Sequence, residues 1–150
     1  MRSAQQWLQE YSVTHQNPLN KRIHKVCVPA IFWAVFALLW AIPPLAFMAT
    51  IPYCNWATLV MLAVLAFYLS LGVVFFVDMF FVALLTFSLI MIVDKLSWPL
   101  APIAGLVFVV AWIGQFYGHK VEGKKPAFIQ DILFLLIGPL WIVNNLKRKS

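Results

Sequence analysis

The residues of this chain best suited to chemistry are its three histidines, His15, His24 and His119. His24 lies just before an uncharged apolar run over residues 26–77, and His119 directly follows a second run over 96–118. All three stand outside these membrane-length runs in a chain with few ionisable groups. This pattern indicates a metal site assembled from distant segments at a membrane surface. The alternative is that the histidines are only polar anchors at the interface.

The composition indicates an integral membrane protein. The 150 residues are 63% hydrophobic and 11% charged, whereas soluble domains are about half apolar and about a quarter charged. Apolar runs of about 20 residues are long enough to cross a bilayer as helices. We therefore expect one membrane domain over residues 1–150. The polar N-terminus does not have the pattern of a signal peptide.

The N-terminal part predicts two helices before the first membrane run. Residues 3–15 read as a short amphipathic helix that lies in the interface, with Trp7, Leu8 and Tyr11 on one face. Asn17-Pro18 interrupts it, and Asn as N-cap with Pro at the first helical position favours a new helix from Pro18. Residues 1–25 thus form a cytoplasmic or interfacial segment that carries two histidines.

The apolar runs are divided by prolines and charges into membrane spans over residues 26–118. Pro43-Pro44 and residues 51–55 break the first run, and the turn after the second span falls at Gly72 or Asp78. The predicted spans are 26–48, 56–77, 79–93 and 98–118. The fold class is therefore all-α: a polytopic integral membrane helical bundle with about four spanning helices.

Four crossings return the chain to its starting side and place His119 on the same face as His15 and His24. Residues 119–150 then form a cytoplasmic loop with His119 and a C-terminal membrane segment. The basic residues of this face mark it as cytoplasmic and attract membrane lipids. No extended basic face is present for nucleic acid. The basic residues are Lys21, Arg22, Lys25, Lys120, Lys124 and Lys125.

The last apolar segment, residues 127–143, either re-enters the membrane or forms a fifth membrane helix. It is interrupted by Asp131 and by Gly138-Pro139. A full crossing would place the basic cluster at 147–149 outside, against the positive-inside rule. A re-entrant or interfacial hairpin that turns at Gly138-Pro139 is therefore favoured.

Polar residues accompany two of the histidines at helical spacing. Asn20 and His24 are four residues apart, as are Gln115 and His119, and Glu122 lies three beyond His119. Three imidazoles, with or without Glu122 and water, suit Fe(II) or Zn(II). Asn20, Gln115 and Glu122 are also candidates to hydrogen-bond the second ring nitrogen of a ligand.

Two motifs resemble those of a known family. They are Tyr11-x3-His15-x4-Asn20-x3-His24 and Trp112-x2-Gln115-x2-Gly118-His119-x2-Glu122-x3-Pro126-Ala127. The pattern is similar to a family of small membrane proteins typified by the yeast 2-hydroxy fatty acid dioxygenase of phytosphingosine breakdown, over nearly the whole chain. The chain departs from the family after His24, where residues 25–29 replace a Gly-x-Pro.

The resemblance implies an Fe(II)-dependent α-oxidation in which a 2-hydroxy fatty acid and O2 give CO2 and the fatty acid one carbon shorter. It implies that the three histidines hold the iron and that Glu122 is a fourth ligand or a base. Asn20, Gln115 and Tyr11 would orient ligands or O2. Arg22, Lys21 or Lys120 would pair with the substrate carboxylate.

Two other classes of function stay open from the sequence. A zinc-dependent membrane hydrolase would use the same ligands to activate water. A non-enzymatic lipid-binding protein would bind no metal. A bacterial inner membrane is the expected location, with the endoplasmic reticulum as the alternative for a eukaryotic protein.

Overall fold

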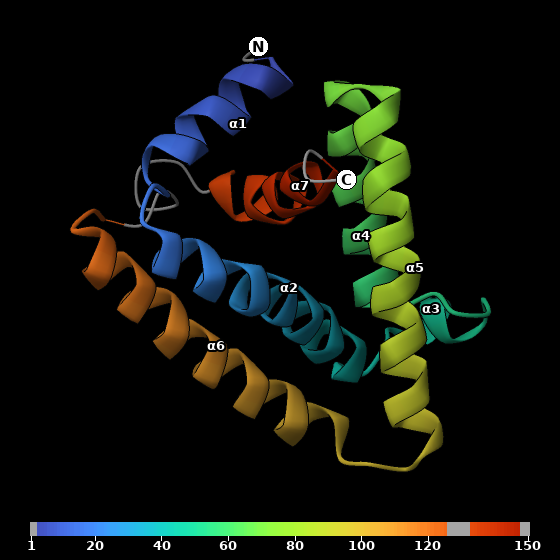
Figure 1. Cartoon of the computed structure of the whole chain (residues 1–150). Helices are drawn as coiled ribbons and strands as arrows, with labels where there is room; N and C mark the ends of the chain where they lie inside the picture. Colours follow the sequence, from blue (N-terminus) through green and yellow to red (C-terminus); the bar gives the residue numbers. More distant parts are fainter. Residues whose placement is uncertain (1–2, 126–132, 148–150) are drawn as a thin grey trace. The chain divides into compact units, whose positions relative to one another are not determined.

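The computed structural model describes residues 3–125 and 133–147, and within these ranges the chain forms helices and no strand. This confirms the all-α class (Figure 1). Ala127 and Asp131, which the sequence placed in the last membrane segment, lie outside the described residues. The helices are α1 Ala4–Val13, α2 Pro18–Ala41, α3 Ala46–Ala49, α4 Trp56–Leu71, α5 Val73–Lys95, α6 Leu100–Glu122 and α7 Phe134–Lys147.

The helices group into two compact units, which we call the terminal and the central unit. The terminal unit combines Met1–Ile31 with Val109–Ser150, and the central unit is Phe32–Phe108. The long helices α2 and α6 each contribute to both. All three histidines belong to the terminal unit.

The central unit contains a helical hairpin in which α4 and α5 lie side by side (Figure 1). Asn55 caps α4, with its side chain accepting a hydrogen bond from the Thr58 amide. The hairpin turns at Gly72, whose φ of +139° is a conformation that favours glycine. Of the two predicted turn positions Gly72 is therefore correct, and Asp78 lies inside α5.

Three helices of the described chain, α2, α5 and α6, are long and apolar enough to cross a membrane. Large apolar side chains on α5, such as Phe81 at 64% and Leu85 at 61% exposed, suit contact with lipid. The 16 residues of α4 and the 14 of α7 make shorter apolar helices. The exact number of membrane spans, expected to be about four, therefore stays a prediction.

The predicted span boundaries differ from the structure at several points. The second span was expected to end at 77 and the third to begin at 79, whereas α4 ends at Leu71 and α5 begins at Val73. The first span was expected to reach residue 48, but α2 ends at Ala41, because Pro43 disfavours helical geometry at Ile42. The last span was expected to end at 118, but α6 continues to Glu122 and is followed by Gly123 at φ +71°. His119 thus lies in the last turn of a helix and not in a loop.

In the terminal unit, α1 packs against α7 through the face that the sequence predicted. A capping box between Ser3 and Gln6 starts α1. The Trp7 ring meets Phe134 edge to face with centroids 5.1 Å apart, and Leu8 and Tyr11 on the same face are also buried. The amphipathic helix is confirmed, and its apolar face contacts protein.

The turn expected at Gly138-Pro139 does not form, because α7 runs through both residues. Proline removes one helical hydrogen bond but is tolerated where packing holds the helix. Here every residue from Ile137 to Ile142 is buried. Gly138 also makes room for Tyr11, since a β-carbon at this position would lie 3.1 Å from the Tyr11 hydroxyl.

Candidate metal centre

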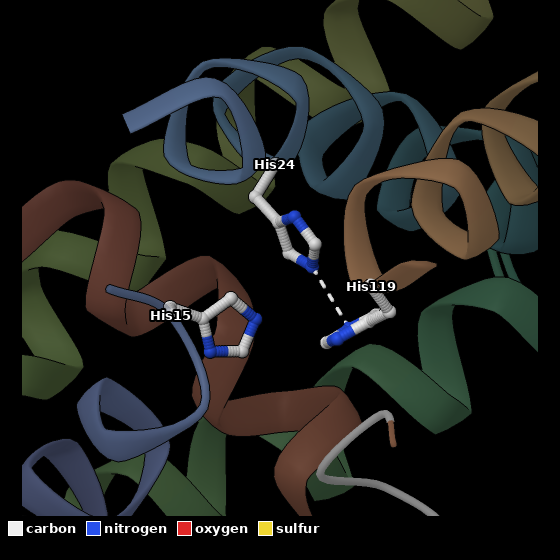
Figure 2. A group of neighbouring side chains, drawn as sticks. All are labelled: His15, His24 and His119. Carbon is white, nitrogen blue, oxygen red and sulfur yellow. Dashed lines mark hydrogen bonds between the residues drawn. The ribbon is translucent and has the colours of Figure 1, made fainter. Parts of the chain in front are cut away.

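His15, His24 and His119 come together in the terminal unit, although they belong to three different segments of the chain. Each offers one ring nitrogen, and these atoms all lie within 4.8 Å of one another. The side chains are 1%, 1% and 7% exposed. Figure 2 shows the three rings turned toward a common point. Three buried imidazoles at this spacing form a group that can hold a metal ion.

His15 is presented by the connector between α1 and α2 and is held by α1. Its Nδ1–H donates to the Tyr11 carbonyl at 2.7 Å, and its ring stacks on the Tyr11 ring with centroids 4.1 Å apart. Burial lowers the pKa of His15 to about 4, against the opposing effect of the Tyr11 carbonyl. His15 is therefore neutral at pH 7, and its Nε2 lone pair is available to a metal.

His24 and His119 are in direct contact. The Nδ1–H of His24 donates to the Asn20 carbonyl at 3.0 Å, which leaves His24 Nε2 as a lone pair. This atom lies 3.2 Å from His119 Nε2. Because His24 Nε2 can only accept, His119 Nε2–H is the donor in the metal-free protein. A metal would replace that proton.

The distance between these two nitrogens fits a shared metal ion. Imidazole nitrogens bind zinc at about 2.0–2.1 Å, so two ligands are about 3.0 Å apart at an angle of about 90° and about 3.4 Å apart at about 109°. The 3.2 Å between His24 Nε2 and His119 Nε2 falls in this interval. Two ligands of one ion are at most about 4.2 Å apart. The widest separation, 4.8 Å, must therefore shorten by at least about half an ångström on binding.

Two glycines of α6 allow α2 to approach closely enough for this contact. A β-carbon on Gly114 would lie 2.6 Å from Cys27 Sγ, and one on Gly118 would overlap Asn20 Oδ1. Small residues at this spacing let helix backbones pack closely. The glycine before His119 therefore helps to bring His24 and His119 together in the candidate metal centre.

The polar residues predicted to accompany the histidines have different surroundings. The Asn20 side chain is fully buried, and its Nδ2–H donates to Glu122 Oε2 at 3.0 Å. Glu122 also accepts hydrogen bonds from the backbone amides of Gln16 and Asn17 at 2.8 Å each. Gln115 is buried on the histidine-bearing helix, and its Oε1 has no hydrogen-bond partner among the described residues.

The three cations expected to pair with a substrate carboxylate differ in their exposure. Lys21 is half-buried, and its charge contributes to lowering the pKa of His15. Arg22 and Lys120 are exposed. Of the three cations, Lys21 is therefore the one whose charge acts on the candidate ligand His15.

Sequence reasoning missed Trp141, which forms a wall of the site. Its ring lies 5.5 Å from the rings of both Tyr11 and His15, and its Nε1–H donates to Ser12 Oγ at 2.8 Å. Trp141 is 4% exposed. Trp141 lies two residues after Pro139 in the sequence, and the turn expected at Gly138-Pro139 gave no reason to place it at the site.

A comparison with curated proteins gives no match, and a comparison with solved structures also gives none. A family model described as 2-hydroxy-palmitic acid dioxygenase Mpo1-like matches residues 1–150. The match extends over both motifs that carry the histidines. The chain belongs to the Mpo1-like family, whose description names a dioxygenase of a 2-hydroxy fatty acid.

Proposed function

We propose that this protein is a membrane-embedded Fe(II)-dependent dioxygenase that shortens 2-hydroxy fatty acids by one carbon. The observation that carries the proposal is the convergence of three buried histidines at ligand spacing in a chain of this family. The donor set fits iron, because Fe(II) accepts imidazole nitrogen and three histidines leave positions for further ligands.

In this proposal His15, His24 and His119 hold the metal through one ring nitrogen each. Backbone carbonyls fix the ring orientation of His15 and His24 through Nδ1, the usual way in which a protein orients a histidine ligand. Bound Fe(II) would supply the redox chemistry that allows O2 to react with the substrate. Burial by Tyr11 and Trp141 restricts the access of water on one side.

The overall reaction balances without a second organic substrate. A 2-hydroxy acid, R-CH(OH)-COOH, and O2 give R-COOH, CO2 and H2O. The bond between the carboxyl carbon and the hydroxylated carbon breaks, and the substrate gives four electrons to O2. No 2-oxoglutarate is needed.

The substrate would lie with its carboxylate at the membrane surface and its acyl chain along apolar helices. Lys21, with Arg22 and Lys120 as alternatives, would pair with the carboxylate. The exposed apolar side chains support a membrane location. We place the site on the cytoplasmic face, in a bacterial inner membrane or, for a eukaryotic protein, in the endoplasmic reticulum.

The experiment is to purify the protein in detergent without oxygen and to measure bound metals by mass spectrometry, with His24→Ala and His119→Ala beside it. We expect about one iron per chain, lost in both variants. The iron-loaded protein should consume O2 with 2-hydroxypalmitate and release the C15 acid, but should not react with palmitate or with 3-hydroxypalmitate.

Labelled oxygen makes the assay specific for a dioxygenase. With ¹⁸O2, label should enter the shortened acid, whereas label entering only from H2¹⁸O would refute direct oxygenation. Zinc at one per chain with no O2 consumption would favour the membrane hydrolase. Absence of any metal from folded protein, even after addition of Fe(II), would refute the metal site.

A further inference from the structure

The end of α6 holds both sides of the connector that carries His15. On one side, Glu122 accepts hydrogen bonds from the Gln16 and Asn17 amides at 2.8 Å each. On the other side, Lys124 Nζ donates to the Val13 carbonyl at 2.7 Å. We call Glu122 and Lys124 the clamp. These bonds join segments that are more than 100 residues apart in sequence.

The charges of the clamp match the helix ends that they contact. The first amides of a helix and its last carbonyls have no partner within the helix. A negative group is favoured at the N-terminus and a positive group at the C-terminus. Glu122 accepts from the backbone amide of Asn17, directly before α2, and Lys124 donates to the carbonyl of Val13, the last residue of α1. Gly123, at φ +71°, turns the chain between the two clamp residues.

Both oxygens of the Glu122 carboxylate accept hydrogen bonds in these contacts. Oε1 accepts from the Gln16 amide, and Oε2 accepts from both the Asn17 amide and Asn20 Nδ2. Three N–H donors on two oxygens favour a carboxylate that organises backbone over one that ligates a metal. The group of potential ligands that converges in the structure consists of the three histidines.

The clamp matters for the metal centre because His15 is the histidine that does not lie on a long helix. His24 and His119 meet directly across α2 and α6. The local bonds of His15 are to Tyr11 and Thr14 within its own segment. The clamp ties that segment to the other two ligands, since Glu122 lies one turn after His119 on α6.

We propose that Glu122 is a positioning residue, assisted by Lys124, that sets the place of His15 relative to His24 and His119 and thereby the affinity for metal. The role in affinity rests on the proposed function, while the mechanical role of the clamp does not. Glu122 acts chiefly through His15, because its remaining contact, with Asn20, is to the side chain and not to the carbonyl that holds His24. Its removal therefore weakens metal binding much more while His15 is present.

The first test measures hydrogen exchange of the metal-free protein in detergent by mass spectrometry, over a peptide that contains residues 12–18. Glu122→Gln puts an amide NH2 where one carboxylate oxygen accepted an N–H, so at least one bond breaks. We expect at least one of the backbone amides of Gln16 and Asn17 to exchange about tenfold faster. Asp94→Asn, which removes a carboxylate on α5, should leave them unchanged. Unchanged exchange in Glu122→Gln would overturn the proposal.

The second test is a double-mutant cycle on Co(II) affinity with Glu122→Gln, His15→Ala and the double variant. We expect Glu122→Gln to weaken binding about 10- to 100-fold, as for other residues that orient ligands, and to have a much smaller effect in the His15→Ala background. An equal loss in both backgrounds would identify Glu122 as a ligand or a general stabiliser and would overturn the proposal.

Lys124→Gln keeps the proposal testable if Glu122→Gln does not fold. Lys124 is exposed, and its neighbour Lys125 is an exposed lysine that serves as the matched control. We expect Lys124→Gln to weaken Co(II) binding about two- to tenfold relative to Lys125→Gln, and equal affinities would count against the clamp. A wild-type protein that binds no Co(II) refutes the proposed metal site, and the exchange experiment still decides whether the clamp exists.

Discussion

Gly118→Ala tests how closely α2 and α6 must approach to form the metal centre. The added β-carbon would overlap Asn20 Oδ1 and lie 3.5 Å from His24 Cε1. A flexible side chain would move aside, but Asn20 is fully buried and its Nδ2–H is bonded to Glu122. The clash must therefore displace the helix or break that hydrogen bond.

The size of the effect can be isolated with a matched glycine on the same helix. Gly105→Ala meets nothing within 4 Å, so it changes only helix propensity, by up to about 1 kcal/mol in favour of folding. Overpacking costs about 1–3 kcal/mol. Because both variants share the propensity gain, Gly118→Ala should be less stable than Gly105→Ala by about 1–3 kcal/mol.

Thermal unfolding in detergent measures this difference, and Co(II) titration measures its effect on the site. We expect Gly118→Ala to unfold at a lower temperature than Gly105→Ala and to bind Co(II) more weakly. Equal melting temperatures and equal affinities would refute the view that close packing at Gly118 sets the position of Asn20 and His24.

Two further predictions concern the polar residues of the site. Gln115→Leu should weaken metal binding about tenfold. Ligation through Nε2 requires the single ring proton of His119 to move to Nδ1, and Gln115 Oε1, four residues earlier on α6 and like His119 Nδ1 without a partner among the described residues, is the candidate acceptor. Co(II) titration, with Gln115→Glu as the variant that keeps an acceptor, measures this, and equal loss in both variants would contradict it. Lys21→Gln should raise the KM for a 2-hydroxy fatty acid more than Arg22→Gln, because Lys21 is half-buried and its charge reaches His15; steady-state O2 consumption measures both constants, and a larger effect of Arg22→Gln would show that the carboxylate binds elsewhere.

Periodicity and residue type predicted much of the helical framework. Local rules that act within a few residues predict the amphipathic face of α1 and the start of α2 at Pro18. They also gave Gly72 as one of two candidate positions for the turn between α4 and α5. The sequence grouped the histidines by counting four membrane crossings, and the structure brings the three side chains together. Hydrophobic runs also report where helices can lie, whereas the number of crossings and the side on which each helix ends stay predictions.

Contacts between distant segments could not be predicted in the same way. Gly138-Pro139 was read as a turn because proline disfavours helix interiors, but burial of Ile137 and Trp141 overrides this preference. The bonds of Glu122 to the Gln16 and Asn17 amides involve backbone atoms, which leave no trace in residue type. The packing of α7 on α1 had to be known before the first could be recognised, and the position of the end of α6 before the second.

The sequence separation of the histidines has a consequence for biosynthesis. His24 and His119 are 95 residues apart, and the Phe32–Phe108 unit between them contributes none of the three. While the ribosome synthesises that unit, the nascent chain carries only two of the histidines. The third is added only after the whole Phe32–Phe108 unit has been synthesised. Any ligand that needs all three histidines can therefore bind only after the central helices have been made.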